Sequence, residues 1–330
     1  MSLALAPLAA SAWDRGDVQR FATLPSGAGH PEGIAADKDG NIYTTIFDPT
    51  GAATNKHQMF VFDRQGRLVR EVNIAGASHA LLGLDFHPTT GALLVLDFGQ
   101  GKVLKVDPVT GASTVFTTVT GASGLNALTF DQQGNVYISD SFQGIIWRTG
   151  PNGSPTATVW AQDPLLQPNG IPPFGANGLG FNKAFNTLFV ANTANDSIIQ
   201  IPVTPSATGP VAGPASALAY SVNGADGLIL DADDNLWICA NQSDEIVVLD
   251  KTGKVISKLG DFDGVDRDQA PIGLLFPASP VRVGDWIYIT NLSLDLRNVG
   301  GPQTIDSQWA DEVQTQTLAR IRARIRPNRE

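Results

Sequence analysis

The hydrophobic pattern of the chain is a unit that recurs six times. Each unit has a leading residue and a small residue, then a short apolar run, a polar turn and a second apolar run. A clear copy reads N-A-L-T-F-D-Q-Q-G-N-V-Y-I-S-D from Asn126. Two apolar runs around a turn rich in Asp, Asn and Gly predict a β-hairpin. The six copies begin at Glu32, Leu82, Asn126, Asn177, Asp226 and Ile272.

The spacing of the copies predicts the architecture. The steps between them are 50, 44, 51, 49 and 46 residues, which is the length of one four-stranded propeller blade. The residues between copies supply further strand pairs, at 57–72, 101–116 and 245–259. We therefore expect an all-β fold, a six-bladed β-propeller of four-stranded antiparallel blades. The alternative is a solenoid of six hairpin sheets, which needs capping elements that the sequence does not offer.

The last copy is one strand short. After it, T-L-A-R-I-R-A-R-I supplies a single outer strand from Thr317, whereas D-V-Q-R-F-A-T-L near the N-terminus is a strand without a blade. We expect this N-terminal strand to complete the sixth blade, because that closes the ring and removes an exposed sheet edge. Residues 17–330 then form a single domain.

Composition agrees with an all-β domain and narrows the partners. Gly (34) and Pro (21) are frequent, as many chain reversals require, and 42% of the residues are hydrophobic. The net charge of −10 argues against nucleic acid or an anionic membrane surface as a partner, and no apolar run is long enough for a membrane helix. The one cysteine, Cys239, lies in an apolar run and is expected to be a buried core thiol.

Residues 1–16 stand apart from the repeats. They are rich in Ala and Leu and end near an A-x-A-like triplet, but they lack a basic start. They are interpreted as an N-terminal arm or a signal remnant, which favours a periplasmic or secreted protein over a cytoplasmic one.

The leading residues of the six units carry the candidate chemistry. In a propeller the equivalent residues of the innermost strands form a ring around the central channel. Four of them are oxygen donors, Glu32, Asn126, Asn177 and Asp226. N-G and D-G are often simple turn dipeptides, but these recur at one position of the repeat, away from its actual turns. Convergent buried oxygens need a partner, and a hard divalent cation supplies one. Calcium is favoured over zinc, manganese or magnesium.

These residues resemble the gluconolactonase and regucalcin family of six-bladed propellers and, more distantly, the paraoxonases and diisopropyl fluorophosphatases. The resemblance rests on P-E-G-I-A from Pro31, A-N-G-L-G-F from Ala176, and A-D-G-L-I-L-D-A-D-D-N-L-W from Ala225. It implies that Glu32, Asn177 and Asp226 bind the metal, with Asn126 as a fourth ligand or a substrate-orienting amide. Leu82 and Ile272 depart from it: the catalytic histidine of paraoxonases has no counterpart here.

Two classes of function follow. The first is a metal-dependent hydrolase, with a lactonase as the expected type, in which Asp226 acts as general base or nucleophile, or serves only as a ligand. The second is a strictosidine-synthase-like enzyme or a non-catalytic ligand-binding ring with a structural metal. An accessible metal favours the first class, and a channel plugged by side chains favours the second.

Residues in the loops at the metal end are expected to set specificity for a small-molecule substrate. The candidates for substrate binding are Phe47, Phe98, Asn126, Phe142, Phe174, Asn192, Asn241 and His79. The stretch from Leu292 to Gln314 is the longest break in the repeat, and we interpret it as a lid or an oligomer contact with Trp309 as an apolar anchor. The sequence leaves open whether the protein is a monomer or a dimer.

Overall fold

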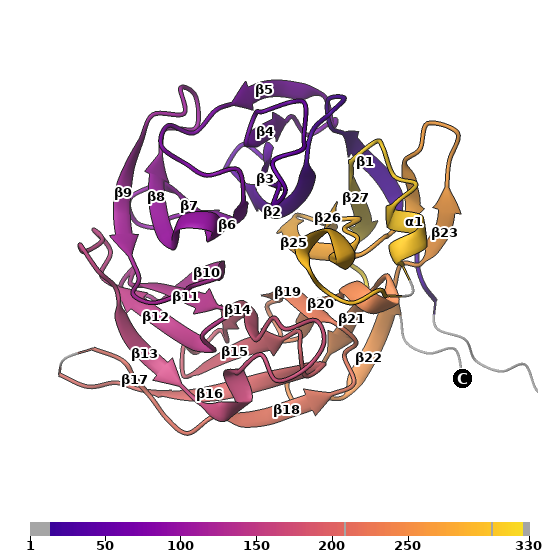
Figure 1. Cartoon of the computed structure of the whole chain (residues 1–330). Helices are drawn as coiled ribbons and strands as arrows, with labels where there is room; N and C mark the ends of the chain where they lie inside the picture. The colour runs from indigo at the N-terminus through magenta and orange to yellow at the C-terminus, as the bar shows by residue number, and fades with distance from the viewer. Residues whose placement is uncertain (1–13, 208, 305, 326–330) are drawn as a thin grey trace, which may run out of the picture.

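The structure, a computed structural model, describes residues 14–207, 209–304 and 306–325. Six antiparallel sheets surround a central channel, and in each of them one strand faces the channel (Figure 1). The predicted six-bladed propeller is therefore confirmed, and the solenoid is excluded because the ring is closed.

Five blades are continuous in sequence and run outward from the channel. The first three are β2 (His30–Ala36), β3 (Ile42–Phe47), β4 (Met59–Phe62), β5 (Leu68–Val72); β6 (Leu81–Phe86), β7 (Leu93–Asp97), β8 (Lys102–Val106), β9 (Ser113–Thr118); and β10 (Leu125–Phe130), β11 (Val136–Asp140), β12 (Ile145–Thr149), β13 (Thr158–Gln162). The fourth and fifth are β14 (Ala176–Phe181), β15 (Thr187–Asn192), β16 (Ser197–Thr204), with β17 (Val211–Ala212) and β18 (Ser216–Tyr220) both on β16; and β19 (Ala225–Leu230), β20 (Leu236–Ala240), β21 (Glu245–Leu249), β22 (Val255–Leu259).

The sixth blade joins the two ends of the chain. It consists of β25 (Pro277–Val283), β26 (Trp286–Asn291), β27 (Thr317–Arg322) and the N-terminal β1 (Gln19–Thr23). Strand β1 pairs antiparallel with β27, so the predicted closure by an N-terminal strand is confirmed. Within residues 14–16 the backbone already contacts the ring, since the amide of Gly260 donates to the carbonyl of Arg15 at 2.7 Å. Residues 1–13 of the predicted arm lie outside the described part of the chain.

Helical elements are short. They are η1 (Phe98–Gln100), η2 (Pro164–Leu166), η3 (Asn241–Ser243), η4 (Leu296–Val299) and α1 (Ser307–Ala310). In the described part of the chain, no helix has the length and apolar character needed to cross a membrane.

The turn motif of the repeat forms the end of the ring away from the candidate site. In the third blade, Oδ1 of Asp131 accepts the amides of Gln133 at 3.0 Å and Asn135 at 2.9 Å, and Oδ2 accepts the side-chain amide of Asn135 at 2.7 Å. The hydroxyl of Tyr137 donates to the same carboxylate at 3.1 Å. Asp37 and Asp231 form the same turn in the first and fifth blades. The D-x-x-G/D-N motif thus fixes the hairpins by satisfying their backbone amides.

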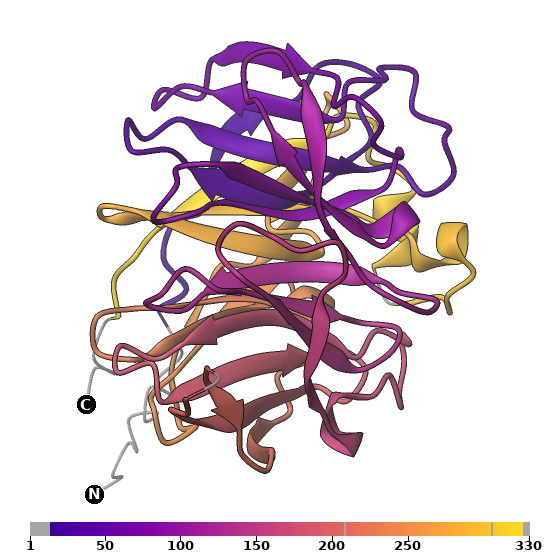
Figure 2. The same ribbon diagram turned by 90° about the vertical axis from the view of Figure 1, so that its left-hand side faces the viewer.

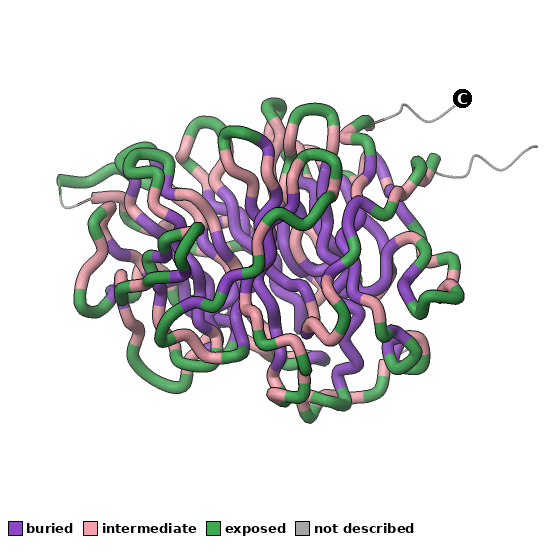
Figure 3. The backbone as a smooth tube through the Cα atoms, turned by 90° about the horizontal axis from the view of Figure 1, so that it is seen from above, coloured by how far each residue is buried: buried purple, intermediate pink, exposed green. Residues whose placement is uncertain are grey.

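The hydrophobic core lies between neighbouring blades. Strands β7, β11 and β20 are buried along their whole length, and buried residues fill the middle of the ring while exposed ones lie in the connecting loops (Figure 3). Cys239, in β20, is fully buried and free, as expected.

The innermost strands share one irregularity that forms the ring of leading residues. In the third blade Leu125 pairs with Asp140 and Leu128 pairs with Ile138, so Asn126 and Ala127 are left out of the ladder as a bulge. The other five blades have the bulge at the equivalent place. Its first residues are Glu32, Leu82, Asn126, Asn177, Asp226 and Ala278.

The sixth ring position was predicted wrongly. Ile272 lies in β24 (Pro271–Gly273), which pairs with β23 (Phe262–Val265) outside the blades, and its side chain is 43% exposed. Ala278 takes the ring position instead. The error arises because I-G-L-L-F imitates the apolar run of the other copies. The true inner strand contains Pro277 and Pro280, which are poor strand formers that a bulge tolerates.

A small residue follows the ring residue because neighbouring blades approach closely there. A Cβ atom on Gly178 would lie 2.5 Å from the carbonyl oxygen of Asp226, and one on Gly227 would lie 2.6 Å from that of Ala278. Contacts this short are forbidden, so glycine at these two positions allows the inner strands to converge and brings the ring side chains together.

Candidate metal centre

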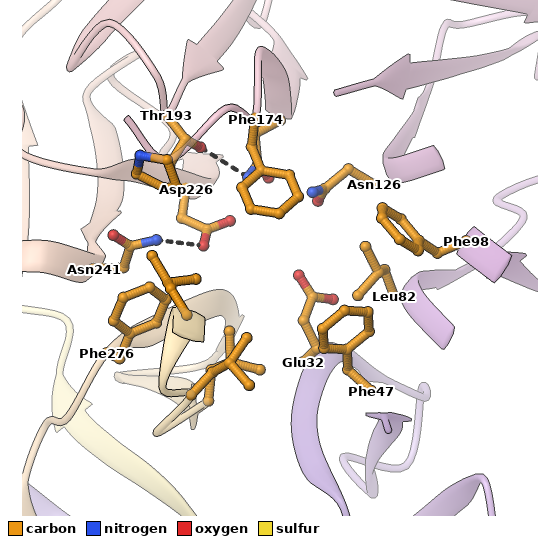
Figure 4. A pocket seen from close by; sticks show the side chains of 15 residues that line it. Glu32, Phe47, Leu82, Phe98, Asn126, Phe174, Thr193, Asp226, Asn241 and Phe276 are labelled. Atoms are coloured by element: carbon orange, nitrogen blue, oxygen red, sulfur yellow. Dashed lines mark hydrogen bonds between the residues drawn. The ribbon is translucent and has the colours of Figure 1, made fainter. Parts of the chain in front are cut away.

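Five of the six ring residues line a cavity at one mouth of the channel (Figure 4). The cavity has a volume of about 50 Å³. Because a buried water needs roughly 10–15 Å³ of such volume, there is space for about three or four waters, or for an ion with part of its hydration shell. The ring residues that line it are Glu32, Leu82, Asn126, Asn177 and Asp226.

Two buried carboxylates face each other across this cavity. Glu32, in β2, is 4% exposed, and Asp226, in β19, is 5% exposed. Oε2 of Glu32 and Oδ1 of Asp226 are buried without a hydrogen-bond partner. Figure 4 shows both carboxylates pointing into the space between the two inner strands. Buried carboxylate oxygens without a partner are costly, so the site is incomplete as it stands.

Asn177 offers a third oxygen. Its side-chain Nδ2 donates to Oγ1 of Thr193 at 2.9 Å, and Thr193 in turn donates to the carbonyl oxygen of Ala225 at 2.7 Å. This chain fixes the orientation of the amide, so Oδ1 of Asn177 is left buried and unpartnered on the cavity side. Thr193 therefore serves as the support of Asn177.

Asn241 supports Asp226 in the same manner. It lies at the start of η3, directly after β20, and its Nδ2 donates to Oδ2 of Asp226 at 2.9 Å. This leaves Oδ1 of Asp226 to face the cavity. Both supporting residues, Thr193 and Asn241, are at most 2% exposed.

The pKa values of the two carboxyl groups also indicate that the site lacks a positively charged partner. Burial, and then the nearby charge of Asp226, raise the pKa of Glu32 well above its usual range. Burial also raises the pKa of Asp226 to about 7, although the hydrogen bond from Asn241 opposes the shift. Both shifts show that the folded chain disfavours negative charge here unless a positive partner is present.

The donor set fits a hard divalent cation. Two carboxylates and two amides supply oxygen ligands, which calcium prefers, and the two negative charges match its charge. Among the described residues, no group of three or more His, Cys, Asp and Glu side chains is arranged to hold a metal. The residues therefore suit a mixed carboxylate and amide site better than a zinc site of nitrogen and sulfur ligands.

Asn126 completes the polar side of the ring. It is 7% exposed and its side chain points toward the centre of the cavity (Figure 4). Leu82 and Ala278 make the remaining ring positions apolar. The polar ring residues thus come from the first, third, fourth and fifth blades, as the sequence predicted.

A second ring lies just above the first. In each blade, one residue of the second strand pairs with the residue just before the bulge, and the member of the second ring comes directly after that second-strand residue. These members are Phe47, Phe98, Ser141, Thr193, Asn241 and Leu292. All except Ser141 line the cavity. Phe47, Phe98 and Asn241 were predicted from the sequence, whereas Thr193 was missed and its neighbour Asn192 was predicted instead. The missed signal is register: Asn192 pairs with Ala176, the residue before the bulge, so Thr193 is the next residue beyond that pair.

Three predicted substrate residues lie outside the cavity. The side chain of Asn192 is buried beneath a loop and donates to the carbonyl oxygens of Leu165 at 2.8 Å and Gln167 at 3.1 Å. His79 is exposed, and its Nδ1 contacts the carbonyl oxygen of Asp48 beside a separate hollow. Phe142 does not line the cavity but packs on two rings that do, those of Phe98 and Phe174.

The segment after β26 covers the mouth of the cavity. Leu292, Leu294 and Leu296 line the cavity and pack with Phe47 and Phe276 in one apolar cluster. In Figure 2 this segment, with η4 and α1 in yellow, stands on one face of the disc. We call residues 292–299 the leucine cap.

Contacts on both sides hold the leucine cap. Nδ1 of His30 lies 2.9 Å from the carbonyl oxygen of Leu292, and the amide of Leu292 donates to the carbonyl of Phe276 at 3.1 Å. Trp309, the expected anchor, packs edge-on against Phe262 at 5.7 Å between ring centroids. It therefore fastens the segment to the small β23–β24 sheet, away from the cavity.

Comparison with known proteins agrees with the resemblance inferred from the sequence. Residues 173–260 match the family model described as the SMP-30/gluconolactonase/LRE-like region. The matched segment contains Asn177, Thr193, Asp226 and Asn241, whereas Glu32 and Asn126 lie outside it. No curated protein sequence matches the chain.

Several solved structures share the fold. A luciferin-regenerating enzyme aligns with a TM-score of 0.65 and 15% identity, covering 93% of this chain and 95% of that chain. A gluconolactonase from Xanthomonas campestris aligns with a TM-score of 0.61 and 13% identity, covering 94% of this chain and 91% of that chain. Regucalcin from Agrobacterium tumefaciens, a calcium-binding protein, aligns with a TM-score of 0.60 and 14% identity, covering 94% of this chain and 98% of that chain. At such low identity these likenesses establish the six-bladed propeller and leave the activity open.

Proposed function

We propose that this protein is a divalent-cation-dependent hydrolase, with calcium as the cation and a lactone or related carboxylic ester as substrate. The observation that carries the proposal is the set of three unpartnered buried oxygens at one cavity: Oε2 of Glu32, Oδ1 of Asn177 and Oδ1 of Asp226. Asn126 is the fourth residue of the set. The matched family segment and the fold shared with a gluconolactonase favour a lactone over other esters as the substrate.

The residues divide into ligands and supports. Glu32, Asn126, Asn177 and Asp226 hold the cation, which when bound supplies a Lewis acid that stabilises negative charge on a carbonyl oxygen. Thr193 and Asn241 fix the two side chains that they contact, so the ligand oxygens are oriented before substrate arrives.

Asp226 is our candidate general base. Its carboxylate accepts a proton from a water molecule as the water oxygen attacks the carbonyl carbon. The bond between that carbon and the ring oxygen then breaks, and Asp226 returns the proton to the leaving oxygen. One lactone and one water thus give one hydroxy acid.

The leucine cap supports a second candidate function. Leu292, Leu294 and Leu296 are at most 6% exposed and close the cavity, which is far smaller than the roughly 300–1,000 Å³ of ordinary ligand pockets. A cation sealed beneath them would be structural, joining four blades in a non-catalytic ring or a strictosidine-synthase-like relative. For hydrolysis the cap has to move aside when substrate enters.

One experiment separates these functions. Purified protein is assayed on a lactone panel with calcium, with chelator, and with calcium restored. The hydrolase proposal expects turnover that chelator abolishes and calcium restores, and it expects Asp226→Asn to lose about 100-fold or more in kcat. Asp285→Asn, which removes an exposed carboxylate, serves as the matched control. A calcium-dependent rise in melting temperature without turnover on any lactone supports the structural cation instead.

A further inference from the structure

The polar side chains that line the cavity are the proposed cation ligands and the two residues that support them. Six polar side chains line it in the described part of the chain: the four proposed ligands, together with Thr193 and Asn241. Thr193 accepts from Asn177 and donates to Ala225, and the amide nitrogen of Asn241 is bonded to Asp226. Beyond the proposed ligands, Oδ1 of Asn241 is the side-chain oxygen of this set that is buried without a partner, so the cavity offers little to pair with the several hydroxyl groups of a sugar.

The rest of the wall is apolar. It consists of phenylalanine and leucine side chains with one proline, Pro172. Five of these side chains form a single buried cluster with the leucine cap, in which Phe47, Leu82 and Phe276 are at most 6% exposed. A ligand hydroxyl placed against this wall would lose its water partners and gain none, which a site rejects strongly.

A path of aromatic rings leads from this wall to the surface. Phe47 meets Phe98 edge-on at 5.6 Å between centroids, Phe98 meets Phe142 edge-on at 5.1 Å, and Phe142 stacks on Phe174 at 5.8 Å. Exposure increases from Phe47, which is 6% exposed, through the half-buried Phe98 to Phe142, which is 43% exposed, and the half-buried Phe174 connects Phe142 back to the cavity wall. Figure 4 shows Phe98 and Phe174 on the same side of the cavity as Asn126.

The sequence makes room for this path. A Cβ atom on Gly124 would lie 2.9 Å from Cδ2 of Phe142 and 3.0 Å from Cε2 of Phe98. Only glycine lets both rings lie over the backbone before β10. The apolar rings are therefore in contact from the exposed Phe142 to Phe47 at the wall of the cavity, and contiguous exposed apolar surface of this kind often marks a ligand-binding groove.

The position of the leucine cap also favours an apolar ligand. Any substrate larger than a few waters has to displace Leu292, Leu294 or Leu296 from the apolar cluster. A polar ligand would leave the displaced leucines and the phenylalanines facing polar groups. An apolar ligand replaces the lost contacts with its own.

Resting on the function proposed above, we infer that the substrate carries an extended alkyl or aryl group, which lies along Phe98 and Phe174 beneath the leucine cap, and that polyhydroxylated sugar lactones are poor substrates. The carbonyl end faces the oxygen ring and the apolar end follows the aromatic path. The substrate specificity of this protein therefore differs from that of a sugar lactonase with the same fold.

Two readouts test this inference, one of binding and one of turnover. The binding probe is the lactam in which NH replaces the ring oxygen of γ-decalactone, titrated calorimetrically with calcium present and compared with the lactam of γ-butyrolactone. We expect the hexyl group to tighten binding by at least about tenfold, since each buried methylene adds roughly fourfold. Turnover is compared among γ-butyrolactone, γ-decalactone and glucono-δ-lactone. We expect kcat/KM to be highest for γ-decalactone, lower for γ-butyrolactone and lowest for glucono-δ-lactone.

Variants locate the effect. Phe98→Ala and Phe174→Ala are each expected to reduce the preference for the hexyl lactam by about tenfold, whereas Phe98→Leu retains most of it. Phe116→Ala, which truncates a half-buried ring on the outer strand β9, is the matched control and leaves the preference unchanged. A circular dichroism melt establishes that each variant is folded.

The outcomes separate this inference from the proposed function. Equal binding of the two lactams, or a glucono-δ-lactone kcat/KM above that of γ-decalactone, overturns the apolar specificity even if the enzyme is an active lactonase. Tight binding of the hexyl lactam that depends on Phe98, with no lactone hydrolysed, upholds the apolar site and overturns the hydrolase proposal.

Discussion

Asn241 donates a hydrogen bond of 2.9 Å from Nδ2 to Oδ2 of Asp226 and thereby leaves Oδ1 of Asp226 facing the cavity. The two residues lie in the same blade, Asp226 at the bulge of β19 and Asn241 just after β20. The pairing makes Asn241 a positioning residue, because the amide fixes the direction of a proposed ligand without reaching the cation itself.

Asn241→Ala is therefore expected to weaken calcium binding by about 10–100-fold, the usual cost of losing a residue that orients a ligand. Isothermal titration with calcium measures the change. Asn135→Ala is the control, because it removes an amide-to-carboxylate hydrogen bond of 2.7 Å at the opposite end of the ring. Equal calcium affinities in the two variants would show that Asn241 does not orient the site.

Thr193→Val removes the acceptor for Asn177 and the donor to Ala225 while keeping the side-chain volume. We expect a loss of about 1–3 kcal/mol in the free energy of unfolding, because the groups left behind are buried, and about tenfold weaker calcium binding. Ser141→Ala is the matched control: its hydroxyl donates to the carbonyl of Ala176 at 2.8 Å in the equivalent position of the third blade. That control should lose stability without losing calcium affinity.

The close approach of the inner strands gives a prediction on stability. A methyl group on Gly178 meets the carbonyl oxygen of Asp226 at 2.5 Å, whereas one on Gly150 meets nothing within 4 Å. Gly178→Ala should therefore reduce the free energy of unfolding by about 1–3 kcal/mol or more, and Gly150→Ala should leave it nearly unchanged. Urea unfolding of the two variants makes the comparison. Similar stabilities would mean that the blades can separate at little cost.

The sequence was sufficient for the fold and for most of the oxygen ring. Asn177-Gly178 and Asp226-Gly227 could be identified because ligand type and close approach both appear as residue identities at one place of a repeat. The sixth ring position could not, because Pro277-Ala278-Ser279-Pro280 carries no strand pattern. Thr193 was missed because a one-residue change in register reverses the face on which a side chain lies.

The position of the leucine cap over the cavity could not be predicted from the sequence. In L-S-L-D-L from Leu292 the alternation suggests a strand with one apolar face, and it does not indicate what that face covers. Its position over the ring depends on contacts distant in sequence, such as that between His30 and the carbonyl of Leu292. The segment was correctly singled out as a break in the repeat, but the packing of its leucines required the structure.

A pair of buried carboxyl groups beside the cap predicts a pH effect on stability. Burial and the neighbouring Asp306 raise the pKa of Asp244 to about 8, and burial raises that of Asp306 to about 6. Both groups bind protons more strongly in the folded chain than in the unfolded one. Their contribution to stability is therefore largest at low pH and is lost as pH rises from about 4 to about 8.

Asp306→Asn removes one of these groups. The variant should be more stable than the wild type at pH 8, by at most about 3 kcal/mol for a shift of roughly two pKa units, and this advantage should shrink to about half near pH 5 and disappear below about pH 4. Melting temperatures of both proteins between about pH 3.5 and 8 measure the difference. Glu312→Gln neutralises an exposed carboxylate of the same segment and should not reproduce it. A variant that is less stable than the wild type at every pH would contradict the prediction.

Whether the oxygen ring binds calcium is tested by calorimetric titration of chelator-treated protein with calcium. The wild type is compared with Glu32→Gln, Asp226→Asn and the control Asp285→Asn. We predict one calcium ion per chain for the wild type and the control, accompanied by a higher melting temperature, and about 100-fold weaker binding in the other two. Failure of the wild type to bind calcium, or unchanged affinity in both Glu32→Gln and Asp226→Asn, would show that the oxygen ring is not a calcium site.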